Sequence, residues 1–298
     1  MKRNQRLILL ISITILLGLG AVYLFLKPPS ARPTTFDGER AYQHVLAQDA
    51  LGPRTPGSEA HAHFIEYAQK EFQAQGWDVT LQKTERMNQP IINILATRQD
   101  NPPVLLMAHY DSRFYADNDP DPANHSQPVP GANDGASGVA VLLELARVLP
   151  PDAPVGLLLV DTEDQGNIPG WDWILGSRAF AESLAYQPEA VILLDMIGDA
   201  DLNIYQERNS DPDLTRELWD VAKRLGYEQY FIPKYKYSML DDHIPFIEKG
   251  IRAVDLIDFD YPYWHTRQDT PDKVSAQSLQ IVGEVVQAWV ADFTASRR

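Results

Sequence analysis

Four short apolar runs in this chain are each followed closely by a carboxylate or an imidazole. The runs span residues 104–107, 155–160, 190–194 and 254–257, and the polar residues after them are His109 and Asp111, Glu163 and Asp164, Asp195, and His265. Continuous apolar runs of this length are typical of strands that helices cover on both faces. The pattern therefore predicts a parallel sheet with its functional side chains at the carboxyl ends of the strands.

Helical and extended patterns alternate along the rest of the chain. We expect helices at 58–75, 137–149, 177–184, 212–225, 243–249 and 275–293, and strands at 79–83, 91–97, 104–108, 155–160, 190–195, near 231 and at 252–257. Successive polar residues from His109 to Asp195, with Asp134 between them, are 25, 30 and 31 residues apart, which fits one crossover connection each. We predict a single α/β/α layered domain with a largely parallel, mixed sheet.

Asp134 lies in a glycine-rich turn, Gly131-Ala-Asn-Asp-Gly-Ala-Ser-Gly138. The glycines free the backbone from side-chain sterics, so the turn can bring Asp134 close to a bound ion before a helix begins near Ser137. Such a cluster before a helix is usually only a turn and a cap. Together with the strand-end residues, it indicates a carboxylate ligand on a loop.

The N-terminal segment predicts a membrane anchor. Three basic residues precede 7–26, a run of twenty residues without a charge, and Lys27-Pro-Pro follows. Twenty residues can span a bilayer, and bulky residues at 23–27 argue against a cleavable signal peptide. The basic N-terminus predicts a cytoplasmic tip and an extracytoplasmic body, periplasmic or extracellular. We expect a tip and anchor at 1–27, a linker at 28–36 and a catalytic domain at 37–298.

Charge and cysteine content narrow the chemistry. The chain has no cysteine, which excludes disulfides, thiolate ligands and a cysteine nucleophile, so a metal must be held by His and carboxylate groups. Beyond residue 27 there are 22 Lys and Arg against 41 Asp and Glu, a net charge of −19. Such a body should be repelled by nucleic acid and anionic lipid, and should attract a cation such as the terminal ammonium of a peptide.

Two local spacings suggest different roles for these polar residues. Asp111 is two residues beyond His109, on the same side of an extended strand, and could hold that imidazole by its second nitrogen. Glu163 and Asp164 are adjacent and would face opposite ways in extended backbone. One could then bind a metal while the other transfers protons.

Seven motifs in a fixed order resemble the zinc aminopeptidases of bacteria and their homologues, the glutaminyl cyclases. The resemblance runs from about Gly57 to the end. The motifs are His109-Tyr-Asp-Ser112, Gly131-Ala-Asn-Asp-Gly135, Glu163-Asp164, Leu175-Gly-Ser-Arg178, Leu194-Asp-Met-Ile-Gly198, Asp241-Asp-His-Ile-Pro-Phe246 and Trp264-His-Thr266.

In the two-zinc aminopeptidases, the resemblance makes Asp134 a bridging ligand. Asp164 and His265 would complete one zinc site, and His109 and Asp195 the other. Glu163 would be the general base that activates water.

In the cyclases, the resemblance implies a single zinc held by the residues at Asp134, Asp164 and His265. Glu163 would shuttle a proton, Asp195 and Asp241 would form a hydrogen-bonded acid network, and Trp264 would line the substrate pocket. Trp171 or Trp173 would be a second pocket tryptophan. Asp164 departs from both branches, which more often have Glu, so its backbone must come closer to the ion.

Two features favour the cyclase branch and one favours the peptidases. Asp241 and Trp264 match the cyclases, where the peptidases usually have Ser and Tyr, whereas 267–274 is similar to the peptidase ending. We expect a glutaminyl-peptide cyclotransferase with one zinc that acts on peptide N-termini. The alternatives are an aminopeptidase with two zinc ions and a non-catalytic binding domain, which should have lost a ligand or the base. Asp255, Asp258 and Asp260, close in sequence to Trp264 and His265, are predicted either to rim the pocket or to form a solvated strand end.

Overall fold

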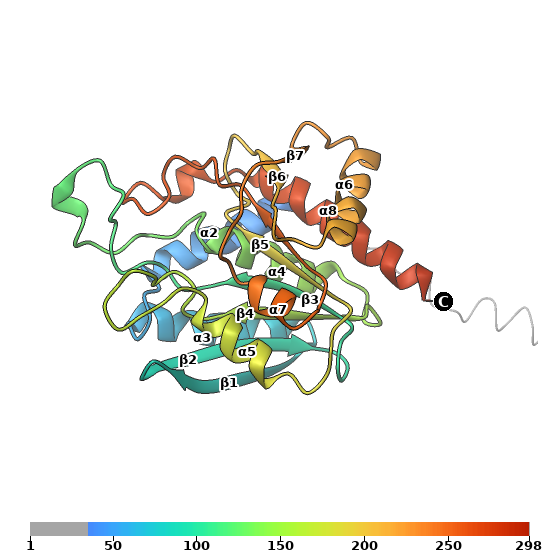
Figure 1. Cartoon of the computed structure of the whole chain (residues 1–298), viewed down its shortest axis with the longest axis horizontal. Coiled ribbons are helices and arrows are strands. Elements are labelled where there is room, and N and C mark those ends of the chain that lie inside the picture. The colour runs from blue at the N-terminus through green and yellow to red at the C-terminus, as the bar shows by residue number, and fades with distance from the viewer. Residues whose placement is uncertain (1–34, 298) are drawn as a thin grey trace, which may run out of the picture. The chain divides into compact units, whose positions relative to one another are not determined.

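A six-stranded sheet in the order β1-β2-β4-β3-β5-β8 forms the centre of the fold (Figure 1). In this computed structural model, which describes residues 35–297, β4, β3, β5 and β8 run parallel, while β1 and β2 form an antiparallel hairpin at one edge. The prediction of a largely parallel, mixed sheet is confirmed. The strands are β1 (Asp78–Arg86), β2 (Gln89–Thr97), β3 (Val104–His109), β4 (Val155–Val160), β5 (Ala190–Asp195) and β8 (Ala253–Ile257).

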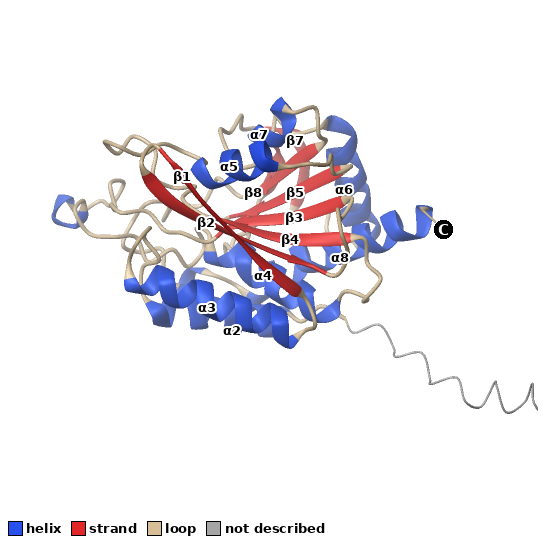
Figure 2. Cartoon of the chain, turned by 90° about the horizontal axis from the view of Figure 1, so that it is seen from below, coloured by secondary structure: helices blue, strands red, loops and turns tan. Residues whose placement is uncertain are grey.

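Helices cover both faces of this sheet (Figure 2). One face carries α2 (Gly38–Leu51), α3 (Glu59–Ala74), α4 (Ala136–Val148), α6 (Pro212–Arg224) and α8 (Ala276–Ser296), and the other carries α5 (Leu175–Ser183) and α7 (Ile244–Glu248). Alternate residues of β3 enter the two cores: Leu106 lies in the first and Leu105 in the second. The predicted α/β/α layering is therefore confirmed for residues 35–297.

Two elements were not expected from the sequence. Helix α2 begins at Asp37, whose side chain accepts the backbone N–H groups of Glu39 and Arg40, but its few apolar positions give only a weak helical period. Strand β6 (Ile204–Gln206) is short and pairs only with β7 (Phe231–Tyr235), in a separate small sheet. Short 3₁₀ helices η1 (Pro122–Asn124) and η2 (Pro271–Lys273) lie in loops.

The predicted anchor at 7–26 and the linker at 28–36 lie outside the described residues, apart from the last two of the linker. Within 35–297, no helix is both long enough and apolar enough to cross a membrane.

The buried strands should dominate the stability of the domain. Leu106 in β3 is fully buried, whereas Leu46 in α2 is 37% exposed. We expect Leu106→Ala to lower the free energy of unfolding by about 2–5 kcal/mol, because it removes apolar contacts and leaves a cavity. Leu46→Ala is the matched control and should change it by about 1 kcal/mol or less. Urea unfolding of both variants tests this, and equal effects would contradict the assignment of the core.

Candidate active site

The candidate residues meet at the carboxyl edge of the sheet. The chain leaves β3 through α4 on one face to reach β4, and then passes through α5 on the opposite face to reach β5 on the other side of β3. This reversal opens a crevice beyond the strand ends, which is the usual ligand position in such sheets. Met107 pairs with Leu193, so His109 and Asp195, two residues further along each strand, reach the same level.

Five of the predicted residues form two groups that share Asp134. His109 Nε2 lies 3.0 Å from Asp134 Oδ1 and 3.1 Å from Asp195 Oδ1. His265 Nε2 lies 2.8 Å from Asp164 Oδ1 and 3.9 Å from Asp134 Oδ2. Within each group the potential ligand atoms lie within 4.8 Å of one another. The structure thus brings together both predicted ligand sets.

The donor atoms of the group formed by Asp134, Asp164 and His265 suit a zinc ion. Asp134 Oδ2 and Asp164 Oδ2 are buried and accept no hydrogen bond within the described structure. Burial lowers the pKa of His265, but the carboxylates of Asp164 and Asp117 outweigh it and raise the pKa to about 9. Imidazole and carboxylate ligands with buried, unsatisfied oxygens are what a bound divalent cation would complete.

Asp111 lies beside His109, where the sequence predicted it, and also contacts the turn after β4, which the sequence did not predict. Its carboxylate lies 3.5 Å from His109 Nδ1. It also accepts the backbone N–H of Glu163 at 2.9 Å and of Asp164 at 3.3 Å, and a side-chain N–H of Gln165 at 3.0 Å. One buried carboxylate therefore lies against the His109 imidazole and fixes the turn after β4 through hydrogen bonds.

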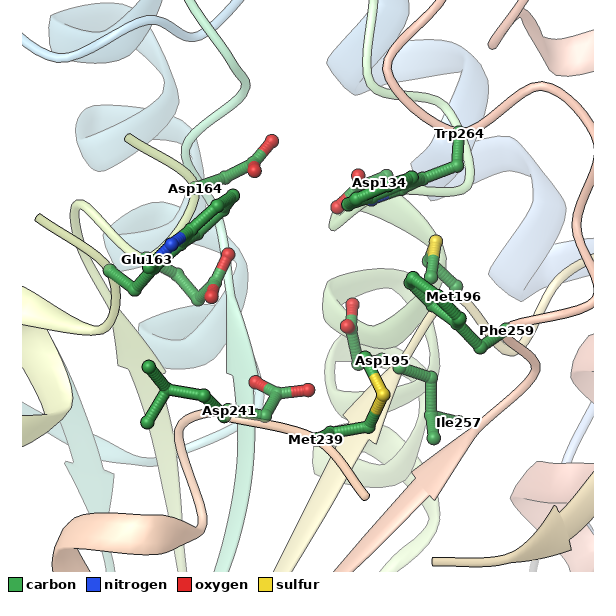
Figure 3. A pocket seen from close by; sticks show the side chains of 12 residues that line it. Asp134, Glu163, Asp164, Asp195, Met196, Met239, Asp241, Ile257, Phe259 and Trp264 are labelled. Atoms are coloured by element: carbon green, nitrogen blue, oxygen red, sulfur yellow. The ribbon is translucent and has the colours of Figure 1, made fainter. Parts of the chain in front are cut away.

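Five acids line a small cavity at these groups: Asp134, Asp164 and Asp195 of the ligand groups, and also Glu163 and Asp241 (Figure 3). The carboxylates of Glu163, Asp195 and Asp241 point into a space of about 160 Å³. Burial and the carboxylates of Asp241 and Asp164 raise the pKa of Glu163 well above its ordinary value. Burial, followed by the charge of Asp195, raises the pKa of Asp241 to about 7. Carboxyl groups with raised pKa values can both hold and release protons near neutral pH.

The remaining walls of the cavity are apolar. They are formed by Trp173, Met196, Met239, Leu240, Ile257, Phe259 and Trp264. Trp264 stacks on the imidazole of His265 at 3.8 Å between ring centroids, and Trp173 stacks on the same ring from 6.1 Å. Trp171 does not line the cavity and instead packs against Phe114. Of the two candidate tryptophans, only Trp173 lies at the pocket.

Of the two interpretations of Asp255, Asp258 and Asp260, the pocket rim was wrong, and a solvated strand end does not describe the first two either. Asp255 and Asp258 are fully buried below the surface, because β8 and the turn after it are covered by neighbouring elements. Asp260 is exposed, but its carboxylate accepts hydrogen bonds from Lys236 at 2.5 and 2.7 Å, and none of the three lines the cavity. The closeness of these three residues to His265 in the sequence did not show which way their side chains point.

Two residues that the sequence did not single out hold the loop that carries Asp134. Asp269 accepts the backbone N–H groups of Asn133 and Asp134 at 2.8 and 3.2 Å. Arg54 is fully buried and donates to the carbonyls of Tyr110, Pro130 and Gly131. A Cβ on Gly131 would lie 2.8 Å from the Arg54 guanidinium, so the glycine permits this approach. No local pattern marks either contact, because both link distant segments.

Comparison with known proteins agrees with this arrangement. Residues 91–290 match the model of peptidase family M28. The crystal structure of Tannerella forsythia glutaminyl cyclase is 35% identical, covers 86% of this chain and 99% of its own, and superposes with a TM-score of 0.80. A Zn-dependent exopeptidase from Parabacteroides distasonis is 31% identical, covers 87% and 99%, and has a TM-score of 0.81.

A third relative comes from a vertebrate. Glutaminyl-peptide cyclotransferase of the snake Boiga irregularis is 26% identical over 290 residues, which cover 81% of this chain and 77% of that protein. The family model matches two thirds of the chain, including every residue of the two candidate ligand groups. This chain therefore belongs to peptidase family M28.

Proposed function

We propose that this protein is a zinc-dependent glutaminyl-peptide cyclotransferase, which converts the N-terminal glutamine of peptides to pyroglutamate and releases ammonia. The observation that carries the proposal is the trio Glu163, Asp195 and Asp241 facing a small cavity between Trp173 and Trp264. Similarity to the glutaminyl cyclase of Tannerella forsythia supports it. The net charge of −19 beyond residue 27 would also attract the terminal ammonium of a peptide.

Asp134, Asp164 and His265 would hold the zinc ion. When bound, zinc supplies a Lewis acid that polarises the side-chain amide carbonyl of the substrate glutamine. Glu163 lies beside Asp164 and opens into the same cavity, so it can accept a proton from the substrate's α-amine. Asp195 and Asp241 would keep that proton within the acid network.

The reaction forms one C–N bond and breaks another. The α-nitrogen attacks the side-chain amide carbon to close a five-membered ring, and the amide nitrogen leaves as ammonia with the proton that Glu163 returns. General acid–base catalysis of this kind contributes about 10²–10⁴-fold. The attack is intramolecular, so the walls need only hold the substrate folded, and their flat apolar surfaces exclude competing water.

An aminopeptidase is the second candidate, and two observations favour it. His109, Asp134 and Asp195 form a complete second ligand group, which would suit a second cation. A peptidase with two ions would use Glu163 to activate water for attack on a backbone carbonyl. The similarity to a Zn-dependent exopeptidase is as high as that to the cyclases in overall superposition.

Replacement of the zinc ligands should separate one-ion from two-ion binding. Asp164→Ala and His265→Ala each leave two of three ligands, so we expect loss of bound zinc by metal analysis. Asp195→Ala is the matched control, since Asp195 belongs only to the second ligand group. Under the cyclase proposal it keeps one zinc per chain. Full zinc content in Asp164→Ala and His265→Ala would refute the site.

Replacement of the proton carrier should leave the metal in place. Glu163→Gln preserves the shape of the side chain but cannot accept a proton. We expect normal zinc content and a loss of turnover of about 10²–10⁴-fold. Activity measured alongside metal content tests this, and undiminished turnover would remove Glu163 from its proposed role.

The reaction itself is tested by mass spectrometry. We expect the protein to remove the mass of one ammonia molecule from a Gln-initiated peptide without releasing a free amino acid. A peptide of the same sequence that begins with Leu is the control and should be unchanged. Stepwise trimming of the Leu peptide, with two zinc ions bound, would establish the aminopeptidase instead.

A further inference from the structure

The long loop after β3 reaches back to two of the proposed zinc ligands. Arg113, in this loop, is buried with 3% of its side chain exposed, and Asp117 lies four residues later with 42% exposed. The guanidinium donates twice to the Asp117 carboxylate, from Nε to Oδ1 at 2.9 Å and from Nη2 to Oδ2 at 2.6 Å. This two-bonded geometry fixes the direction of both side chains.

Arg113 also holds the backbone that carries Asp164. It donates to the carbonyl of Asp164 at 3.0 Å and to that of Gly166 at 3.1 Å, and Nη1 lies 3.9 Å from Asp164 Oδ1. Its guanidinium carbon lies 5.2 Å from the ring centre of Trp173. The donors of Arg113 are thus directed at Asp117 and at the turn after β4, and they set the position from which the short Asp164 side chain reaches into the site.

The same loop holds the segment around His265. Asp117 Oδ1 lies 3.4 Å from His265 Nδ1, the nitrogen that faces away from Asp164. The N–H of Asn118 donates to the His265 carbonyl at 3.1 Å, and the N–H of Arg267 donates to Asp119 Oδ2 at 2.8 Å. His265 has a φ of 55°, a conformation that non-glycine residues adopt only when their surroundings hold them there.

We propose that Arg113 and Asp117 form a clamp that positions Asp164 and His265 for zinc. Asp117 orients the imidazole through Nδ1, and Arg113 fixes both Asp117 and the Asp164 backbone. The two residues are positioning residues, since they act through the ligands. The inference rests on the proposed zinc site, but it does not depend on which peptide reaction the site performs.

Zinc affinity without substrate tests the clamp. We expect Asp117→Ala to raise the zinc dissociation constant about 10–100-fold, the usual effect of losing a carboxylate behind a metal-bound imidazole. Asp117→Asn keeps an acceptor oxygen and should show a smaller increase. Arg113→Lys should weaken zinc binding too. The double variant Arg113→Lys/Asp117→Ala should bind zinc no more weakly than the weaker of the two single variants, because the pair acts as a unit.

Controls separate positioning from folding. Arg86→Lys is the control, since Arg86 of β1 pairs with Glu182 of α5 at 2.6 Å and neither residue lines the cavity. The thermal midpoint of each zinc-free variant should stay close to that of the parent, and saturating zinc should restore turnover in Asp117→Ala. The clamp would be overturned if the zinc dissociation constant of Asp117→Ala stayed within twofold of the parent's. It would also be overturned if the thermal midpoint of the zinc-free variant fell in proportion to the lost zinc affinity. If the parent itself binds no zinc, the proposed function fails instead.

Discussion

Repulsion between buried carboxylates is the constraint on which the active site depends. Asp134, Asp164, Asp195, Asp241 and Glu163 converge beyond the strand ends, and all are at least nine-tenths buried. Burial raises the pKa of Asp164 to about 6 and that of Asp241 to about 7, above the ordinary value of 3.8, with like charges adding to the effect. Uncompensated, such a cluster would be strongly destabilising.

This repulsion links stability to pH in the metal-free protein. Because the folded pKa values of Asp164 and Asp241 lie above those of the unfolded chain, the folded state binds more protons between about pH 4 and 7. His265, whose pKa is raised to about 9, likewise loses its stabilising charge as the pH rises from about 6.5 to 9. Stability from these groups falls as pH rises, and a bound cation would offset that loss.

The fold supplies the close approach that the cluster needs. Asp134 sits on the turn before α4, and the next residue, Gly135, lies against the His109 imidazole, where a Cβ would come within 2.6 Å of Nε2. Asp269 and Arg54 then fix this turn from two other segments. The sheet therefore sets the level of each ligand, and loops from distant parts of the chain set the fine position.

The sequence was a good guide wherever the signal was local. The apolar runs of β4 and β5 predicted those strands to the residue, and the ordered motifs predicted both ligand groups. The two-residue spacing predicted that Asp111 lies beside His109. It was a poor guide where the contact joined distant segments. Nothing in the pattern around Asp117 or Asp269 marks their partners, and the choice of Trp173 over Trp171 depends on the path of an irregular loop.

The placement of Asp241 bears on the choice between the two proposed reactions. A cyclase must keep the proton taken from the α-amine until the amide nitrogen leaves, so it benefits from acids that share a proton. Asp241 and Asp195 are both buried and line the same cavity, and the charge of Asp195 adds to burial in raising the pKa of Asp241 to about 7, which favours a singly protonated pair. A second cation held by His109, Asp134 and Asp195 would require an ionised Asp195, which could then no longer share a proton with Asp241. The acid pair and the second ion are therefore competing uses of Asp195, and the presence of Asp241 favours the acid pair.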